Sequence, residues 1–231
     1  MNVYIEKRKS VRKYKAELLD KEILDKIQRK IDNVQPLFTD VAYSATIVPQ
    51  KFPPKKQNAP YFLILRGEQS EKGLENVGFI GQQISLYLTE LGIGSYFRMG
   101  QPENTGNGSL PYIICIAFGK PDEPLLREKS EFKRKSLSEI SDGNDKRLEY
   151  ARLAPSGLNA QDWYFSASNG QIHCYRKKPN FILKAIKNKL NPIDMGIALA
   201  HIYEASETFS FGTDRFAPAI DGFIYVGTVM S

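Results

Sequence analysis

The sequence predicts a protein of mixed helices and strands that is built as two related halves within one chain. Apolar residues recur at helical spacing in several segments, and short apolar runs bounded by glycine or proline lie between them. A unit made of a long helix followed by an apolar strand occurs twice. With 231 residues, of which 42% are hydrophobic and 25% charged, the chain is long enough to bury a core and has the composition of a folded globular protein.

The first half contains two helical patterns and two short apolar runs. Asp20 is a candidate N-cap for the first helix, and Pro36 lies beyond its end. The second helix is apolar nearly all round and is therefore expected to be central, with Gly92 and Gly94 at its C-terminus. The predicted elements are helices at residues 20–34 and 74–91 and strands at 61–65 and 112–118.

The second half repeats this order of elements. We expect its long helix to begin at Pro192, because proline is favoured in the first turn of a helix. The predicted elements are helices at residues 145–153 and 192–208 and strands at 163–167, 171–176 and 223–228.

Glycines at the ends of the two long helices indicate an internal duplication. Gly78 and Gly94 in the first half correspond to Gly196 and Gly212 in the second, and both pairs are 118 residues apart (196 − 78 and 212 − 94). Amphipathic helices can also resemble each other by chance. A repeat of this length indicates a duplicated domain, and duplicated halves usually pack about a pseudo-two-fold axis.

Composition and motif content narrow the classes of protein. No apolar run approaches the roughly 20 residues of a membrane-spanning helix, and no apolar segment of a secretory signal follows the basic N-terminus. Cys115 and Cys174 lie in strand-like runs, which favours buried free thiols in a reducing compartment. His173 and His201 have no metal-ligand spacing, so no metal site is predicted. We therefore expect a cytoplasmic protein.

The chain carries 32 Lys and Arg residues against 26 Asp and Glu residues, a net charge of +6. The positive charge is scattered, and no zinc finger or aromatic-glycine RNA motif accompanies it. A solvated surface is therefore favoured over a nucleic-acid interface. A few arginines gathered at one pocket would still bind an anion.

The N-terminal segment RKSVRKY places Arg8, Ser10 and Arg12 at alternate positions. In an extended chain these side chains point the same way, so two guanidinium groups flank a hydroxyl. Such an arrangement fits a phosphate or another anionic, planar group. The alternative is a solvated basic N-terminus with no ligand.

Two further segments carry polar or glycine-rich patterns that could approach a ligand. In LAPSGLNAQDWYF, Pro155 ends a helix and leaves Ser156, Asn159 and Gln161 in a loop, where they could contact a ring or simply cap local backbone. In ELGIGSYFRMG, Gly94 either lets the backbone approach a ligand or forms part of a helix C-cap.

Together these segments resemble the FMN-dependent nitroreductase family, and in particular its single-chain duplicated branch. The family's Arg-x-Ser-x-Arg stretch is matched by Arg8, Ser10 and Arg12, and its Leu-Gly-x-Gly-Ser helix end by residues 91–95. Its Ala-Pro-Ser-x-x-Asn-x-Gln-Pro-Trp motif is matched by residues 154–163, except that Asp162 replaces the proline. That motif should precede the central helix, whereas here it follows it.

The resemblance implies an α+β fold with two tandem halves, residues 1–130 and 131–231, each a mainly antiparallel sheet flanked by helices. The halves would pack as a pseudo-dimer, so the chain would act as a monomer. One composite site would hold FMN between them, and the opposite site would be dead. The displaced motif then has an explanation, because each half supplies a different part of the one site.

The resemblance also implies which residues would bind FMN. Arg8 would anchor the phosphate or ribityl group, and Arg12 would lie near the pyrimidine end of the ring. No side chain is assigned a catalytic role, and no residue is assigned as a metal ligand. RKSLSEI is open to two interpretations: a counterpart of RKSVRKY, or a basic tail whose Arg134 joins Arg8 at the phosphate. Arg98 is a departure without an assigned role. The cofactor-binding residues are Arg8, Ser10, Arg12, Gly94, Ser95, Arg98, Met99, Gly100, Arg134, Pro155, Ser156, Asn159 and Gln161.

The implied function is an FMN-dependent NAD(P)H oxidoreductase that passes electrons from a nicotinamide to a nitroaromatic, a quinone or a similar small acceptor. Two alternatives stay open. One is a flavin-binding protein of the same fold with little or no turnover, and the other is a basic nucleic-acid-binding protein.

Overall fold

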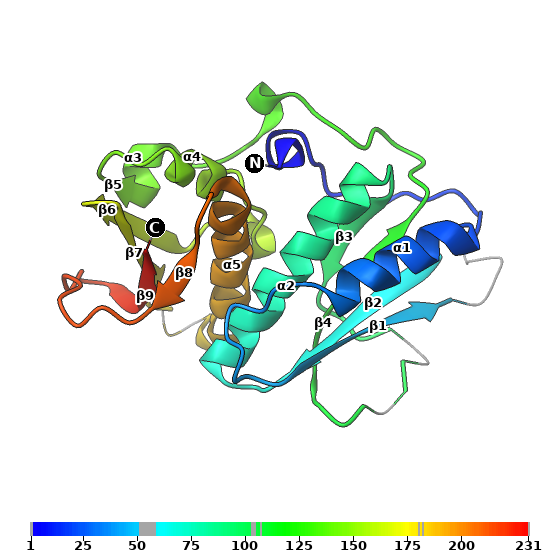
Figure 1. Ribbon diagram of the computed structural model, residues 1–231, viewed down its shortest axis with the longest axis horizontal. Helices are drawn as coiled ribbons and strands as arrows, with labels where there is room; N and C mark the ends of the chain where they lie inside the picture. Colours follow the sequence, from blue (N-terminus) through cyan, green and yellow to red (C-terminus); the bar gives the residue numbers. More distant parts are fainter. Residues whose placement is uncertain are drawn as a thin grey trace.

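Two β-sheets lie on either side of a central pair of long helices in the computed structural model (Figure 1). The structure describes residues 2–50, 59–102, 105–106, 108–179, 181 and 183–230. The central helices are α2 (Glu71–Glu90) and α5 (Lys184–Ala205), which pack on each other between the sheets. Each helix therefore buries one side on a sheet and the other on its partner helix.

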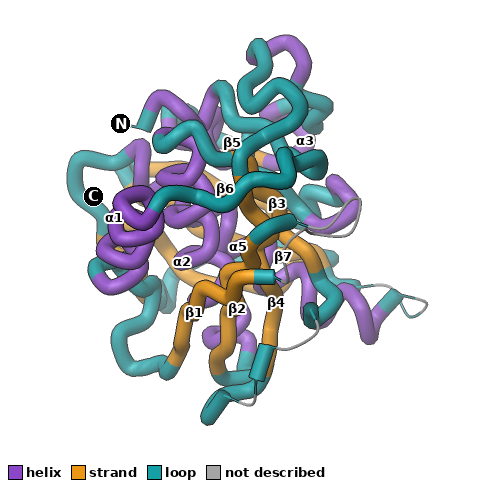
Figure 2. The backbone as a smooth tube through the Cα atoms, turned by 90° about the vertical axis from the view of Figure 1, so that its right-hand side faces the viewer, coloured by secondary structure: helices purple, strands orange, loops and turns teal. Residues whose placement is uncertain are grey.

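The first sheet has four antiparallel strands in the order β1-β2-β4-β3 (Figure 2). Helix α1 (Lys21–Asp32) precedes this sheet in the chain, and Asp20 occupies its N-cap position as predicted, although its side chain makes no capping hydrogen bond. The strands are β1 (Tyr43–Pro49), β2 (Tyr61–Gly67), β3 (Gly94–Arg98) and β4 (Tyr112–Gly119).

The second sheet has five strands in the order β5-β6-β7-β9-β8, and only the β5–β6 pair is parallel. Its strands are β5 (Ser141–Asp142), β6 (Trp163–Ser168), β7 (Gln171–Lys177), β8 (Ser210–Gly212) and β9 (Phe223–Met230). The remaining helices are α3 (Leu137–Ile140) and α4 (Arg147–Arg152), with 3₁₀ turns at Val3–Glu6, Lys129–Glu131 and Gly157–Asn159.

The prediction of an α+β fold with mainly antiparallel sheets and flanking helices is confirmed. The order β1-β2-β4-β3 has the same connectivity as β6-β7-β9-β8, and in both sheets the long helix follows the second of these strands. Both sheets also have an irregularity in the equivalent strand pair, at Leu65/Arg66 and at Cys174/Tyr175. Among the residues that the structure describes, the strand β5 has no counterpart in the first sheet.

The expected start of the second long helix at Pro192 is wrong. Helix α5 begins at Lys184, so Pro192 lies inside it. Proline removes one backbone hydrogen bond from a helix interior, but packing of the buried residues around it outweighs that loss. Lys187 lies in the first turns of the helix. Its charge suggests a solvent-exposed position, but the side chain is buried and its Nζ donates to Asp162 Oδ2 at 2.6 Å. The strands β1 and β3 were not foreseen either.

Helix α2 is buried nearly all round, as its apolar pattern predicted. Its polar side chains keep hydrogen-bond partners in the interior. The Asn76 Oδ1 accepts from the backbone N–H of Leu37 at 2.8 Å, and the Gln83 Nε2 donates to the carbonyl of Gln35 at 2.8 Å. These contacts fix the chain that leads from α1 into β1.

Helices α2 and α5 approach so closely that only glycine fits at their crossing. A Cβ on Gly78 would overlap the carbonyl oxygen of Ile193, and a Cβ on Gly196 would overlap that of Glu75. The two contacts are reciprocal, because Glu75 and Ile193 are also 118 residues apart (193 − 75). The 118-residue spacing noted in the sequence thus recurs in two reciprocal contacts between the helices.

Within the described ranges, no helix is both long enough and apolar enough to cross a bilayer. Cys115 and Cys174 are buried and free.

Replacing Gly196 with alanine should destabilise the protein, because its backbone neighbour cannot rotate away from a new Cβ. We expect the free energy of unfolding, measured by urea denaturation, to fall by about 1–3 kcal/mol despite the better helix propensity of alanine. The exposed Gly100, where a Cβ would meet nothing within 4 Å, is the control. Equal midpoints for Gly196→Ala and Gly100→Ala would contradict the close crossing.

Candidate functional site

A cavity of 190 Å³ lies where the N-terminal segment meets the loop before β6. Ser10 and Arg12 enter it from the N-terminal segment, and Pro155 and Ser156 enter it from the loop before β6. The same loop contributes Gly157 and Leu158, and Met99 follows β3. The remaining walls come from β3, β4 and α5, through Phe97, Ile114, Leu190, Ile193, Asp194 and Ile197. Five of the thirteen predicted cofactor-binding residues therefore line one cavity.

The N-terminal segment is held against the edge strand β3. Ser10 forms a parallel bridge with Ser95, and the backbone N–H of Val11 donates to the Ser95 carbonyl at 3.0 Å. Val11 is buried and lies so close to Gly94 that a Cβ there would overlap its side chain. Gly94 and Ser95 thus position the segment and do not line the cavity.

Arg8 is almost fully buried beside this cavity. Its Nη2 donates to Ser10 Oγ at 3.1 Å, while its Nε and Nη1 have no hydrogen-bond partner among the described residues. Burial lowers the pKa of Arg8 to about 9, and the charges of Arg127, Arg134 and Arg12 act in the same direction. A buried cation with unused donors and three cationic neighbours is the environment of an anion-binding site.

The loop before β6, residues 154–162, is hydrogen-bonded to the basic segment that precedes α3, residues 133–135. Arg134 Nη1 donates to Asn159 Oδ1 at 2.6 Å, Asn159 Nδ2 donates to the Lys133 carbonyl at 2.8 Å, and Gln161 Oε1 accepts from the backbone N–H of Lys135 at 2.7 Å. Asn159 and Gln161 therefore brace the loop and do not line the cavity. The influence of Arg134 on Arg8 favours the interpretation of this segment as a basic tail.

The backbone of that loop is strained. Leu158, Asn159 and Gln161 adopt positive φ values of 55°, 55° and 49°. Residues other than glycine adopt this region at an energetic cost and do so mostly at functional sites. Ser156, which has extended backbone just before these residues, lines the cavity, and Leu158 lines it with 83% of its surface exposed.

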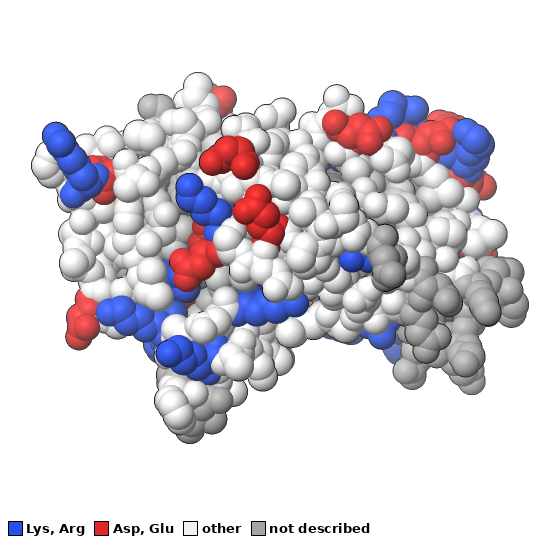
Figure 3. Space-filling view, turned by 90° about the horizontal axis from the view of Figure 1, so that it is seen from below, with Lys and Arg blue, Asp and Glu red and all other residues white. Residues whose placement is uncertain are grey.

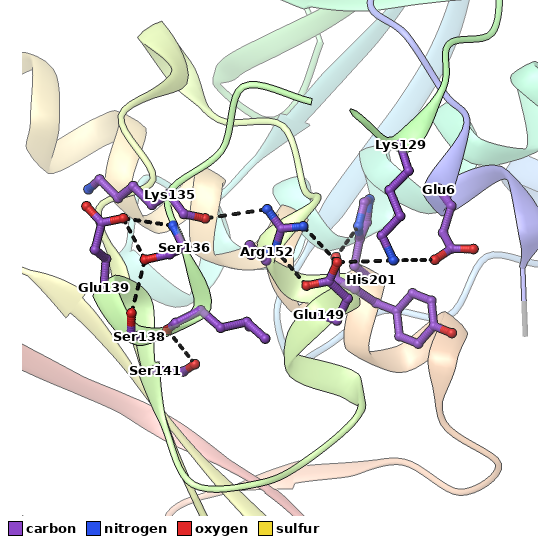
Figure 4. A network of polar contacts seen from close by, with 12 residues as sticks. Glu6, Lys129, Lys135, Ser136, Ser138, Glu139, Ser141, Glu149, Arg152 and His201 are labelled. Atoms are coloured by element: carbon purple, nitrogen blue, oxygen red, sulfur yellow. Dashed lines mark hydrogen bonds and ion pairs between the residues drawn. The ribbon is translucent and has the colours of Figure 1, made fainter. Parts of the chain in front are cut away.

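A polar network fixes the basic segment from the other side (Figure 4). Lys129 Nζ contacts Glu6 Oε1 at 2.9 Å and Glu149 Oε1 at 3.1 Å, and Arg152 pairs with Glu149. Arg152 Nη1 also reaches the carbonyl of Lys135. The network therefore joins the N-terminal turn, the 3₁₀ turn at Lys129–Glu131, α4 and the carbonyl of Lys135.

Strand β3 sends alternate side chains to opposite faces. Phe97 and Met99 line the cavity, whereas the Arg98 guanidinium lies over the Phe62 ring, 5.4 Å from its centroid. Gly100 is exposed and is not among the lining residues. The cavity role expected of residues 98 and 100 therefore gains no geometric support, and Arg98 has a packing contact of its own.

Asp194 is a cavity residue that the sequence reading missed. It is 3% exposed, and its two carboxylate oxygens accept from the backbone N–H of Gly157 at 2.9 and 3.0 Å. Burial raises the pKa of Asp194 to about 7, although the Gly157 hydrogen bond and Lys187 oppose the shift. The available signal was a lone acidic residue in the apolar run from Leu190 to Ile202. Arg127 was also missed, because nothing separates it from the surrounding surface charges.

Both histidines make buried polar contacts. His173 Nδ1 lies 2.8 Å from Thr228 Oγ1, and His201 contacts Gln82 Nε2 and the Tyr150 carbonyl, each at 2.8 Å. Across the part of the chain that the structure describes, no three His, Cys, Asp or Glu side chains gather in a metal-binding arrangement.

The sequence matches the model of a known protein family over most of its length. Residues 2–206 match the family described as "Putative TM nitroreductase". The chain belongs to that family. The nitroreductase resemblance stated from the motifs is therefore confirmed. A comparison with curated proteins found no match.

One solved structure described as a nitroreductase shares the fold over nearly the whole chain. A Thermotoga maritima protein described as a "putative nitroreductase" is 23% identical, with a TM-score of 0.67 over 99% of this chain and 92% of its own. Two matches have lower TM-scores, of 0.45 and 0.42. One is an FMN-dependent nitroreductase from Clostridium difficile (21% identity, 63% of this chain and 100% of its own). The other is a nitroreductase with bound FMN from Desulfitobacterium hafniense (17% identity, 57% of this chain and 96% of its own).

Inorganic phosphate should stabilise this nitroreductase-family chain by relieving the crowding around Arg8. At a concentration of about 100 times the dissociation constant, linkage adds about 2.7 kcal/mol, which raises the thermal midpoint by several degrees. Arg8→Met should lose most of this response and should unfold no more easily than the wild type without phosphate, because it removes an unpaired buried charge. Sodium chloride at equal ionic strength is the control. Equal phosphate responses in both proteins would exclude Arg8 from the anion site.

Asp194 should make stability depend on pH. Its pKa is raised in the folded state from 3.8 to about 7, so the neutral carboxyl is favoured by folding. Relative to Asp194→Asn, the wild type should lose up to about 4 kcal/mol of unfolding free energy as the pH rises from about 4 through about 7. Urea denaturation of both proteins across this range measures the difference. Parallel pH profiles would show that Asp194 does not titrate in this window.

Proposed function

We propose that the chain is an FMN-dependent NAD(P)H oxidoreductase that reduces a small acceptor such as a nitroaromatic or a quinone. The observation that carries the proposal is the buried Arg8, whose Nε and Nη1 have no hydrogen-bond partner among the described residues and whose charge lies near those of Arg127, Arg134 and Arg12. Ser10, which accepts from Arg8 Nη2, lines the cavity together with Arg12. Membership of the nitroreductase family supports the same activity.

The residues present fit FMN by the chemistry of their donor groups. The orphaned Nε and Nη1 of Arg8, together with Arg127 and Arg134, would hold the phosphate. Ser10 and Ser156 would contact polar parts of the cofactor, and Phe97, Ile114 and Ile197 would cover the flat ring. Bound FMN would supply the redox chemistry, accepting hydride from a nicotinamide and passing electrons on.

Arg12 would stabilise negative charge inside the cavity. Its backbone N–H donates to Glu123 Oε1 at 2.6 Å, and its guanidinium lies 5.1 Å from the centroid of the Tyr96 ring. The side chain is therefore positioned at the cavity before any ligand arrives. A fixed positive charge favours a bound group that gains an electron pair.

Asp194 would position the loop rather than transfer a proton. Both of its oxygens accept from Gly157, which directly follows Ser156. The exposed side chains of Leu158 and Met99 lie at the mouth, where they would exclude water from a bound ring. The cofactor itself carries the electron transfer, so we assign no catalytic side chain.

We also propose that residues 1–130 and 131–231 are duplicated halves that pack as a pseudo-dimer with one flavin site. Equal strand connectivity and the reciprocal contacts of Gly78 and Gly196 support this arrangement. Ser10 and Arg12 come from the first half and Ser156 from the second, so the site is composite. A cytoplasmic monomer that uses a small-molecule acceptor is the form we propose.

A nucleic-acid partner has weaker support than a flavin. On the face shown in Figure 3, acidic and basic side chains are interspersed and form no continuous basic stripe. A flavin-binding protein without turnover remains as an outcome of the experiments below.

Purified protein should be yellow and release about one FMN per chain on denaturation. Arg12→Ala should weaken FMN affinity about tenfold or slow flavin reduction, because a charge-assisted contact is lost. The control Lys13→Ala removes an adjacent exposed positive charge that does not line the cavity. Flavin absorbance during titration, followed by anaerobic mixing with NADH and NADPH, measures both quantities.

The possible results separate the proposals. Bound FMN that neither nicotinamide reduces would replace the oxidoreductase with a flavin-binding protein. A colourless protein that does not bind added FMN would overturn the flavin site altogether. Equal effects of Arg12→Ala and Lys13→Ala would remove Arg12 from it.

A further inference from the structure

A second cavity, of 340 Å³, lies at the N-terminal turns of α2 beside β7, β8 and β9. The 118-residue spacing between α2 and α5 relates two of its residues to those of the first cavity. Lys72 corresponds in this way to Leu190, and Glu75 to Ile193. Equivalent helix positions therefore carry charged side chains in this cavity and apolar side chains in the first. This cavity is independent of the proposed flavin site.

Arg176 is the first charged group in this cavity. It lies on β7 and is 2% exposed, and its Nε has no hydrogen-bond partner among the described residues. Its Nη2 forms an ion pair with Glu71, whose side chain is 67% exposed. A buried guanidinium thus has one ion-pair partner at the solvent edge and an unused donor inside.

Glu75 is the second buried charged group. It is 4% exposed, and its carboxyl makes no side-chain hydrogen bond within the ranges that the structure describes. Burial raises the pKa of Glu75 to about 8, although the charge of Arg176 opposes the shift. At neutral pH the group is therefore mostly protonated, and it offers a donor in place of a second negative charge.

Aromatic rings form the apolar part of the cavity. Phe38 and Phe211 both line it and meet edge to face, with centroids 5.9 Å apart. Lys72 Nζ lies 5.3 Å from the centroid of the Phe38 ring. Flat apolar groups pack favourably against such rings, and cavities of a few hundred Å³ with a few polar groups are typical of small-molecule sites.

We propose that this second cavity binds a small molecule with one carboxylate and a flat, apolar body. Arg176 Nε and the Glu75 hydroxyl would donate to the carboxylate, and Phe38 and Phe211 would cover the body. With Arg176 and Lys72 positive, Glu71 negative and Glu75 neutral, the lining carries one net positive charge. That balance suits a monoanion, whereas a phosphate dianion would leave a buried negative charge unpaired.

Isothermal titration calorimetry with benzoate tests the proposal on the full-length protein. Benzoate should bind the wild type, and Arg176→Gln should weaken binding about tenfold or more. Arg8→Met changes the other cavity and should leave the benzoate affinity unchanged. If Arg8→Met abolishes binding while Arg176→Gln does not, benzoate occupies the arginine cluster and the proposal is overturned.

Two milder variants keep the test decisive if Arg176→Gln fails to fold. Glu71→Gln removes the competing carboxylate from the surface end of Arg176 and should tighten benzoate binding severalfold. Glu75→Gln keeps a hydrogen-bond donor at this position and should preserve benzoate binding. No heat from benzoate up to about 10 mM, or an unchanged affinity in Glu71→Gln, would overturn the proposal. So would equal binding of the neutral benzamide, or tighter binding of the cationic benzylamine.

Discussion

The close approach of α2 and α5 is the constraint on which the rest of the structure depends. Two helix backbones can come this near only where a side chain is missing, and Gly78 and Gly196 provide that gap reciprocally. Burial of both helices then follows, since each is covered by its partner and by a sheet. The same crossing places Ile193 beside the first cavity and Glu75 beside the second. One packing contact therefore sets the shape of both candidate sites.

The two cavities differ in charge more than in architecture. Arg12 lines the first, and the buried Arg8 beside it lies near the charges of Arg12, Arg127 and Arg134 and keeps two donors without an acceptor among the described residues. The second balances Arg176 against an acidic neighbour at its edge. Burying an unpaired cation costs stability, so an anion bound beside Arg8 would stabilise the first arrangement.

Much of the fold and part of the site could be predicted from the sequence. The helical spacing of apolar residues located α1 and α2, and the alternation of Arg8, Ser10 and Arg12 identified a segment that does reach the cavity. The start of α5 was misplaced, because Lys187 reads as solvent-exposed and its buried partner, Asp162, lies 25 residues away. Asp194 was missed for a similar reason. Its role depends on Gly157, a contact made by tertiary packing that no local pattern encodes.

The bracing role of Asn159 shows the same limit. Its motif marks the right loop, yet its side chain contacts Arg134 and the Lys133 carbonyl in place of the cavity. Sequence motifs identified which segments meet. They did not distinguish residues that face the cavity from those that hold its walls, because that depends on backbone conformations such as the positive φ values at Leu158 and Gln161.

That Ser10, Arg12 and Ser156 belong to one polypeptide has a consequence for how the site responds to dilution. In an assembly of separate subunits, the two walls of such a cavity part when the protein concentration falls below the dissociation constant of the complex. Here the covalent chain keeps both walls at a fixed effective concentration. The first cavity should therefore survive intact at trace abundance, where a site shared between separate chains would be lost.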